Sequence, residues 1–290
     1  MTQSENAADN AESGGHSVRE VSTAEKVATF RKLHERREAF VIVNPWDLGS
    51  AKILEGLGFE ALATTSGGFA WSIATADGAV DRDTKLEHCR QLAAGTRLPL
   101  SADLGIGFGQ SANDVFETVR LAAATGLAGG SIEDASVLDG VPIPLELAVE
   151  RITAAVEAAR ASDHGFVLTA RCEHYVQGSR NLAATIRRLQ AYGEAGADVL
   201  FAPGMVDIDE IRSVCEAVDQ PVNVLTGFRG MEISFEDLHI AGVKRISVGT
   251  QLARIAYGAF LNAATELKAG GKIVEHDIDV RSADIVRFFR

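Results

Sequence analysis

Short apolar runs alternate with amphipathic segments along most of the chain. The runs with the length and composition of buried strands lie at residues 39–44, 61–66, 98–103, 127–133, 165–171, 197–202, 221–226 and 243–249. The amphipathic segments, which predict helices, lie near 50–58, 83–95, 112–125, 145–161, 180–195, 207–218, 234–241 and 250–269. Strands that are apolar throughout and alternate with helices indicate a parallel sheet covered on both faces. Eight such units in succession predict an α/β fold, a (β/α)8 TIM barrel rather than an open sheet.

The two ends of the chain lie outside these eight units. Residues 1–20 are polar and acidic, without the basic and apolar segments of a signal peptide, and we expect a disordered tail. One helix is predicted near 22–37 and another near 281–289, after the eighth unit. No linker interrupts residues 21–290, so we expect a single barrel domain whose extra C-terminal helix packs on a neighbouring subunit.

Composition and charge narrow the range of functions. The chain has 290 residues, of which 46% are hydrophobic and 23% charged, as in globular proteins and unlike disordered or fibrous ones. A formal charge of −12 argues against nucleic acid or an anionic membrane as the main partner. No apolar run approaches the roughly 18 residues of a membrane span. Cys89, Cys172 and Cys215 form no CxxC pair, so we expect neither disulfides nor a zinc site, and a cytoplasmic location.

Charged residues stand at the ends of three successive predicted strands, where a barrel builds its active site. Asp103 ends the third strand, Glu133 the fourth and Arg171 the fifth. Carboxylates that converge from adjacent strands suit an oxygen-ligand cation such as Mg²⁺. Arg171 offers a bidentate clamp for a carboxylate or a phosphonate; the alternative is a salt bridge at the barrel rim with Glu133 or Glu173.

Two loops after predicted strands can approach a ligand through their backbone. Ser66, Gly67 and Gly68 offer consecutive N–H groups that can hold an anionic oxygen. The segment 103–109 is rich in glycine and allows a sharp turn, but it matches neither the dinucleotide pattern GxGxxG nor the P-loop pattern.

Strand alternation separates the inward from the outward residues at these ends. Asp134, one position after Glu133, is expected to point away from the barrel mouth and to hydrogen-bond the next segment. Cys172, one position after Arg171, is expected to face the helices and to have a packing role.

Four of these strand ends together resemble the isocitrate lyase/phosphoenolpyruvate mutase superfamily. The markers are T-S-G-G at 65–68, A-D-x-x-x-G-F-G at 102–109, G-x-S-I-E-D at 129–134 and T-A-R at 169–171. The similarity runs from about Phe40 to the final helix. The resemblance implies a (β/α)8 barrel whose C-terminal helix is exchanged between subunits, usually in a tetramer. It also implies Mg²⁺ that holds a 2-oxo acid by its keto and carboxylate oxygens, and cleavage or formation of C–C or P–C bonds beside the resulting enolate.

The resemblance also implies roles for individual residues. Asp103 matches the principal metal ligand, and Glu133 matches a ligand that acts through water. Arg171 is similar to the arginine that grips the substrate, and Ser66, Gly67 and Gly68 match the carboxylate-binding segment. Asp77, in A-T-A-D-G, falls where many members carry an aspartate near substrate and metal, so Arg171 and Asp77 are the candidate catalytic residues.

Two departures from the family pattern affect the expected activity. Members usually have a second acid two residues after the first metal aspartate, and here that position is Gly105. Isocitrate and methylisocitrate lyases carry a K-[KR]-C-G-H loop after the fourth strand, whereas residues 135–144 read A-S-V-L-D-G-V-P-I-P. We therefore do not expect those two lyase activities. The same segment also lacks the basic and amide residues of a phosphoenolpyruvate mutase loop.

These observations lead to one principal hypothesis and two alternatives. We expect a Mg²⁺-dependent lyase or hydrolase, with Mn²⁺ as a substitute, that cleaves a C–C bond of a small, oxaloacetate-like 2-oxo or 2-hydroxy dicarboxylate through a metal-stabilised enolate. This chemistry needs fewer acid–base residues than aldol cleavage, so it is the one most compatible with the missing loop. The first alternative is P–C chemistry on phosphonopyruvate or phosphoenolpyruvate. The second is a non-catalytic barrel that binds a 2-oxo acid or a protein. The expected partners are a small 2-oxo acid and further copies of the chain, as a dimer or tetramer.

Overall fold

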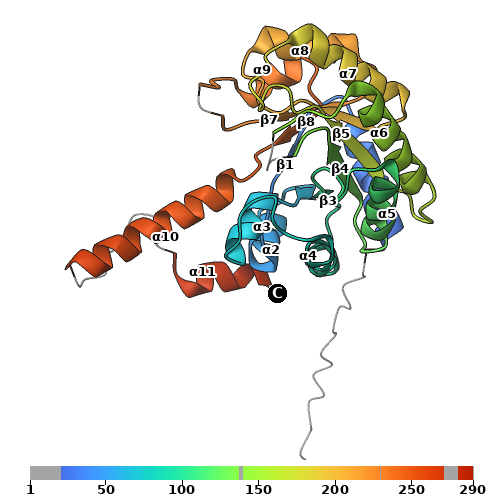
Figure 1. Ribbon diagram of the computed structural model, residues 1–290. Helices are drawn as coiled ribbons and strands as arrows, with labels where there is room; N and C mark the ends of the chain where they lie inside the picture. The colour runs from blue at the N-terminus through green and yellow to red at the C-terminus, as the bar shows by residue number, and fades with distance from the viewer. Residues whose placement is uncertain (1–20, 137–139, 229, 271–279, 290) are drawn as a thin grey trace, which may run out of the picture.

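Eight parallel strands form one sheet in the computed structural model, which describes residues 21–136, 140–228, 230–270 and 280–289 (Figure 1). The strands are β1 (Phe40–Ile42), β2 (Leu62–Ala63), β3 (Leu100–Asp103), β4 (Gly129–Glu133), β5 (Val167–Arg171), β6 (Val199–Phe201), β7 (Val222–Leu225) and β8 (Arg245–Ser247). Their order is β1-β8-β7-β6-β5-β4-β3-β2, and a parallel bridge between Val43 and Leu62 brings β1 beside β2. The sheet is thus a nearly closed barrel, and the predicted (β/α)8 TIM fold is confirmed.

Helices follow the strands in alternation, and all of them except the last, α10, cover the outside of the barrel (Figure 1). They are α2 (Leu48–Gly56), α4 (Arg82–Gly95), α5 (Ala112–Ala123), α6 (Leu145–Arg160), α7 (Leu182–Glu194), α8 (Ile208–Ala217), α9 (Phe235–Ile240) and α10 (Gln251–Gly270). In α5, Val115, Val119 and Ala122 recur at helical spacing and are fully buried in the main core. A capping box of Ser111 and Asp114 fixes where this helix begins.

Helix α1 (Thr23–Glu35) packs against the N-terminal part of the barrel, the end opposite the strand ends discussed above. Its Val27, Phe30 and Leu33 form an apolar cluster with residues at or near the starts of the strands, namely Phe40, Ile42, Ala61, Ala128, Val167 and Val199. This packing excludes water from that end of the barrel, so a ligand has to enter from the other.

The structure differs from the sequence prediction after the second strand. A strand was expected over 61–66, followed by an irregular anion-binding loop, but β2 ends at Ala63 and a short helix α3 (Ser66–Ser72) begins. Thr65 caps α3 by accepting a hydrogen bond from the Gly68 N–H at 3.3 Å. The cap satisfies a backbone donor that a strand would have left for a ligand, so Ser66, Gly67 and Gly68 form a helical turn.

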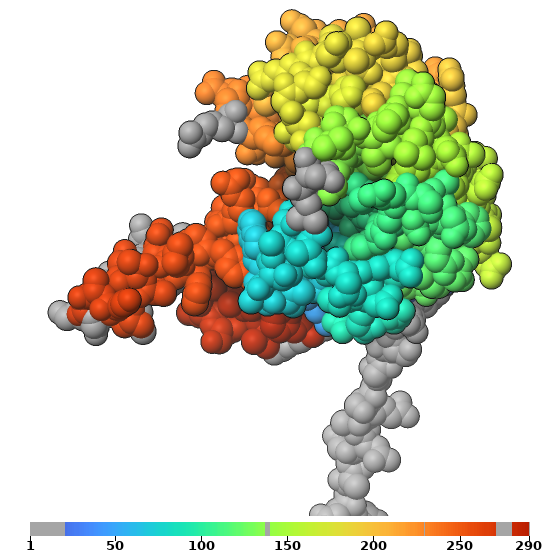
Figure 2. All heavy atoms as spheres, viewed as in Figure 1, coloured from blue at the N-terminus to red at the C-terminus, as the bar shows by residue number. Residues whose placement is uncertain are grey.

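The C-terminal helices differ in how they contact the barrel. Helix α10 projects away from the other helices, and of its described residues only Ala253 is buried (Figures 1 and 2). The predicted last helix is divided into α11 (Ser282–Val286) and the 3-10 turn η1 (Arg287–Phe289), and η1 lies against α2 of the same chain, with the Phe288 ring over Gly56. Exchange of this helix between subunits stays a prediction.

Two further predictions, the N-terminal tail and the single domain, are not tested by the described residues. The tail expected at residues 1–20 lies outside the described residues, and the single domain over 21–290 stays a prediction. No helix in the described ranges is long and apolar enough to cross a membrane.

Candidate active site

A cavity of about 400 Å³ opens at the carboxyl ends of the strands. Its volume lies in the range usual for small-molecule pockets, and its position is where barrel enzymes place their chemistry. The acidic and basic side chains in its lining are Asp77, Lys85, Asp103, Glu133, Arg171 and Arg245. Five of the seven candidate residues from the sequence (Ser66, Asp77, Asp103, Glu133 and Arg171) line this one cavity, and Gly67 and Gly68 are in the same turn as Ser66.

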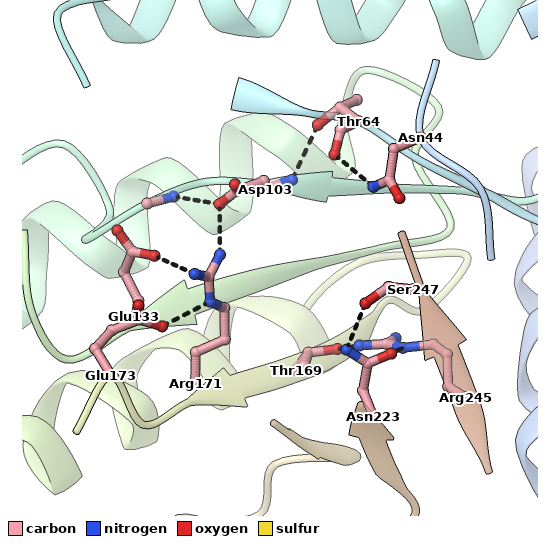
Figure 3. Close-up of polar contacts among 11 residues, drawn as sticks. Asn44, Thr64, Asp103, Glu133, Thr169, Arg171, Glu173, Asn223, Arg245 and Ser247 are labelled. Carbon is pink, nitrogen blue, oxygen red and sulfur yellow. Dashed lines mark hydrogen bonds and ion pairs between the residues drawn. The ribbon is translucent and has the colours of Figure 1, made fainter. Parts of the chain in front are cut away.

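One arginine joins the acids at the ends of three strands (Figure 3). Arg171 on β5 donates through Nη1 to Asp103 Oδ1 on β3 at 3.3 Å and through Nη2 to Glu133 Oε2 on β4 at 3.0 Å. Its Nε donates to Glu173 Oε1 at 2.9 Å. The register of β4 and β5 places Glu133 directly beside Arg171, which explains why these side chains meet. The salt bridges that the sequence left as an alternative are therefore present with both glutamates.

Burial and the nearby cations shift the acids in opposite directions. Burial opposes ionisation of Asp103, but the charges of Arg171 and Lys85 outweigh it and hold the pKa of Asp103 below its usual range. Burial raises the pKa of Glu133 well above its ordinary value, against the opposing charge of Arg171, and it raises the pKa of Glu173 in the same way. Asp103 is thus the carboxylate best suited to remain ionised beside a cation.

Asp77 reaches the cavity from the segment after α3. The carboxylate lies so close to Gly67 that a Cβ added there would stand 3.1 Å from Asp77 Oδ2, and also 2.9 Å from Thr250 Cγ2. Glycine at position 67 therefore permits this approach. The Asp77 Oδ1 atom is buried and has no hydrogen-bond partner within the described part of the chain. A buried carboxylate oxygen that accepts no hydrogen bond is unfavourable by itself, so this atom is suited to bind a cation or to accept a hydrogen bond from a ligand.

Gly105 stands where the resemblance in the sequence implies a second acid, and its backbone explains why glycine fits. Its φ of +55° lies in the left-handed region, and its N–H donates to Asp103 Oδ1 at 3.2 Å. A Cβ at this position would lie 3.7 Å from Glu133 Oε1, in ordinary contact. The turn orients Asp103 through the backbone, and there is room for a side chain.

A second set of buried contacts holds the strand ends in place. Asp134 accepts hydrogen bonds from the Glu173 N–H at 2.8 Å, from Arg188 Nη1 at 3.0 Å and from the Tyr192 hydroxyl at 2.6 Å. Asp134 lies outside the cavity lining, as expected, but its side chain bonds the segment after β5 and α7, and only its backbone carbonyl is bonded by the next segment, at Ile143 N. Cys172 is fully buried and lies outside the cavity lining, in agreement with a packing role. Burial raises the pKa of its thiol far above the ordinary value.

Sequence reasoning missed two buried cations in this cavity. Lys85 lies on the buried face of α4 with Leu86 and Cys89, and Arg245 lies within β8. Arg245 donates through Nε to Asn223 and through Nη2 to Thr169, beside Ser247 (Figure 3). Burial and the charge of Arg171 lower its pKa to about 9. The sequence signal that could have revealed them is a basic residue at a position where the pattern of a predicted helix or strand calls for an apolar, buried side chain.

The carboxylates fit a hard cation bound by few protein ligands. The described residues hold no group of three or more His, Cys, Asp or Glu side chains placed to ligate a metal on their own. Magnesium in proteins usually takes one or two carboxylates and fills its remaining positions with water and substrate. Asp103, with its lowered pKa, and Asp77, with its unpartnered oxygen, are oxygen donors of that kind.

Comparison with known proteins agrees with this geometry. Residues 30–268 match the family described as phosphoenolpyruvate phosphomutase. The chain is 34% identical to the 2-methylisocitrate lyase of Escherichia coli (strain K12) over 203 residues, which cover 67% of each chain.

Solved structures extend the similarity to nearly the whole chain. A Burkholderia cenocepacia J2315 protein assigned as a lyase or mutase has a TM-score of 0.88 and 51% identity, over 92% of this chain and 96% of that one. Phosphonopyruvate hydrolase, crystallised with oxalate and Mg²⁺, has a TM-score of 0.80 and 25% identity, over 91% and 94% of the two chains. The chain therefore belongs to the phosphoenolpyruvate phosphomutase family, within the phosphoenolpyruvate mutase/isocitrate lyase superfamily of lyases and mutases.

Proposed function

We propose that this protein is a Mg²⁺-dependent lyase or hydrolase that cleaves a C–C bond of a small 2-oxo or 2-hydroxy dicarboxylate resembling oxaloacetate. The observation that carries the proposal is the group of Asp77, Asp103 and Glu133 around one cavity at the strand ends, with an unpartnered oxygen on Asp77. The protein belongs to a family with Mg²⁺-binding relatives, and this supports the choice of Mg²⁺ as the metal.

Each of these residues has a distinct part in the proposed reaction. Asp103 would hold Mg²⁺ directly and Glu133 would hold it through water, while Asp77 would lie close to both metal and substrate. When bound, Mg²⁺ lowers the energy of negative charge that develops on the keto oxygen of the substrate. Arg171 keeps the carboxylates oriented and offers its remaining N–H hydrogens to the substrate. In the first turn of α3 (Ser66, Gly67 and Gly68), the N–H groups of Ser66 and Gly67 bind a substrate carboxylate, because the Gly68 N–H is taken by the Thr65 cap.

The segment after β4 favours this chemistry over aldol cleavage of a tricarboxylate. That segment, 135–144, contains no Cys, Lys or His to transfer a proton to the product, although its residues 137–139 lie outside the described structure. Loss of a carboxylate group, or hydrolysis, can take its proton or nucleophile from water.

P–C cleavage of phosphonopyruvate is the second candidate. It is favoured by the similarity to phosphonopyruvate hydrolase, a relative that binds oxalate and Mg²⁺. Incubation of the purified protein with Mg²⁺ and either oxaloacetate or phosphonopyruvate separates the two candidates. Pyruvate or oxalate formed from oxaloacetate supports the first, and phosphate released from phosphonopyruvate supports the second.

Calorimetric titration with Mg²⁺ or Mn²⁺ tests the metal centre itself. We expect binding by the wild type, loss of at least tenfold in affinity in Asp103→Asn, and no change in Asp83→Asn, an exposed aspartate on α4. A wild type that binds neither metal, with or without oxalate, would overturn the proposed function and leave a non-catalytic barrel.

We also propose that the protein is a homo-oligomer, a dimer or tetramer, held together through α10. This 20-residue helix exposes Ile255, Phe260, Leu261 and Leu267. Large apolar side chains along one unsupported helix are typical of a surface that another subunit covers.

A further inference from the structure

Lys85 is buried at the cavity and has no hydrogen-bond partner among the described residues. It lies near the start of α4, is 3% exposed and contributes to the cavity lining. Its Nζ is buried and makes no hydrogen bond to any residue that the structure describes. A buried ammonium is costly unless an anion neutralises it, so this position is not one that folding alone would favour.

The other two cations of the cavity lining already have protein partners. Each nitrogen of the Arg171 guanidinium donates to a carboxylate, at 3.3, 3.0 and 2.9 Å. Arg245 donates to Asn223 Oδ1 at 2.9 Å and to Thr169 Oγ1 at 3.0 Å, and its Nη1 lies 3.4 Å from His34 Nε2. Among the cations of the lining, Lys85 is thus the one whose donors have no partner in the described structure.

The ammonium makes no hydrogen bond to an acid in the described structure, although its charge stabilises the Asp103 carboxylate in the same cavity. Its Nζ lies 6.0 Å from the centroid of the Phe69 ring, and that ring stacks on His88 at 3.7 Å. Burial and the charge of Lys85 lower the pKa of His88 to about 4, so the imidazole is neutral at pH 7 and supplies no counter-charge. The aromatic wall can stabilise the cation but cannot neutralise it.

We propose that the Lys85 ammonium binds the substrate carboxylate that the metal does not hold, and so makes the cavity selective for acids with two carboxylates. The inference rests on the proposed function, in which the keto group and one carboxylate go to Mg²⁺ and α3. Because the ammonium and Mg²⁺ repel each other, they bind best to opposite ends of one dianionic acid. A lysine in this place acts as a point charge that follows a carboxylate without requiring fixed geometry.

The test compares malate with lactate, two 2-hydroxy acids that differ by one carboxylate. Their binding in the presence of Mg²⁺ is measured by calorimetry in the wild type, in Lys85→Met and in Arg90→Met, which removes a cation from the exposed face of the same helix. We expect the wild type and Arg90→Met to bind malate at least tenfold more tightly than lactate. In Lys85→Met that preference disappears, while lactate and oxalate bind as before.

Thermal unfolding without ligand adds a readout that separates binding from structure. Lys85→Met removes a buried charge that has no hydrogen-bond partner in the described structure, so we expect its melting temperature to rise, whereas a structural lysine would lower it. A malate preference retained in Lys85→Met, or oxalate binding lost along with it, overturns the assignment.

The proposed function fails separately, if the wild type does not bind oxalate with Mg²⁺. In that case the role of Lys85 is tested by malate binding without metal. Equal malate affinity in the wild type and Lys85→Met would reject the proposal that Lys85 binds a carboxylate.

Discussion

At the scale of single residues, Arg171 shows how the site is held together. One guanidinium binds three carboxylates from β3, β4 and the end of β5, and none of the four side chains is more than about a fifth exposed. Without the arginine, the like charges of the three acids would repel one another in a medium of low dielectric. A bound metal has to share these carboxylates with Arg171, so metal binding and the position of the arginine are coupled.

Gly105 allows the metal site to be altered by one substitution. Gly105→Asp adds a carboxylate where the backbone is left-handed, a conformation that costs most residues about 1–2 kcal/mol but that aspartate tolerates better. We expect Gly105→Asp to bind Mg²⁺ at least fivefold more tightly than the wild type in calorimetry. The control Gly105→Ala carries the backbone strain without the acid and should bind Mg²⁺ as the wild type does. Equal affinity in both variants would show that position 105 does not face the metal.

At the scale of elements, α1 shows how the closed end of the barrel is built around a neutral histidine. His34 donates through Nδ1 to the Phe30 carbonyl at 2.8 Å and packs edge-on against the Phe30 and Phe40 rings. Arg245 Nη1 lies 3.4 Å from its other nitrogen. Burial, together with the charge of Arg245, lowers the pKa of His34 to about 3. The histidine therefore remains uncharged wherever the barrel is folded near neutral pH.

The lowered pKa of His34 predicts a loss of stability in acid. The unfolded chain takes up a proton at this residue below pH 6.5, whereas the folded chain does so only near pH 3, so stability falls as the pH is lowered between these values. At about 1.4 kcal/mol per pH unit, His34 alone lowers the free energy of unfolding by about 2 kcal/mol between pH 6.5 and pH 5.

The variant His34→Gln keeps a donor and an acceptor but does not titrate. In urea unfolding we expect it to be less stable than the wild type at pH 7 and to lose about 2 kcal/mol less on going to pH 5. His88, whose pKa is lowered to about 4, contributes the same slope to both proteins and cancels in the difference. The same loss in both proteins would contradict the prediction.

At the scale of the whole molecule, the barrel and α10 differ in how far their apolar side chains are buried. The barrel buries its apolar residues in a continuous core between sheet and helices. Helix α10 extends away from the barrel (Figure 2), and it carries Phe260 at 71% exposed and Leu261 at 64%. Burial of a phenylalanine side chain contributes about 1.5–3 kcal/mol, so covering this helix stabilises an assembly substantially.

Phe260→Glu places a charge in the proposed subunit contact. Light scattering should give a multiple of the 30.8 kDa chain mass for the wild type and a smaller mass for Phe260→Glu. Ile240→Glu alters a residue on α9 that is 67% exposed and should leave the mass unchanged. A monomeric wild type, or an unchanged mass in Phe260→Glu, would exclude α10 as the subunit contact.

The order of strands and helices could be predicted from the sequence because it depends on local patterns. A buried parallel strand is apolar throughout, a covering helix repeats its apolar residues every three or four positions, and both signals are contained in a few neighbouring residues. The meeting of Asp103, Glu133 and Arg171 followed as well, since parallel strands bring their carboxyl ends to one rim. The motif at 65–68 did not reveal α3, because the Thr65 cap that starts it competes with strand pairing.

By itself, therefore, the sequence determined the barrel, its family and the rim on which the chemistry lies. Only the tertiary structure decided which charges are neutralised and which are left for a ligand. Arg171 and Asp103 are 68 residues apart in the chain, and Arg245 meets Thr169 across 76 residues. The rim on which Asp103 and Arg171 meet was predicted, but which atoms pair depends on how the closed sheet directs each side chain, and no local pattern encodes that. The unpartnered Lys85 became evident only once these other pairs were known.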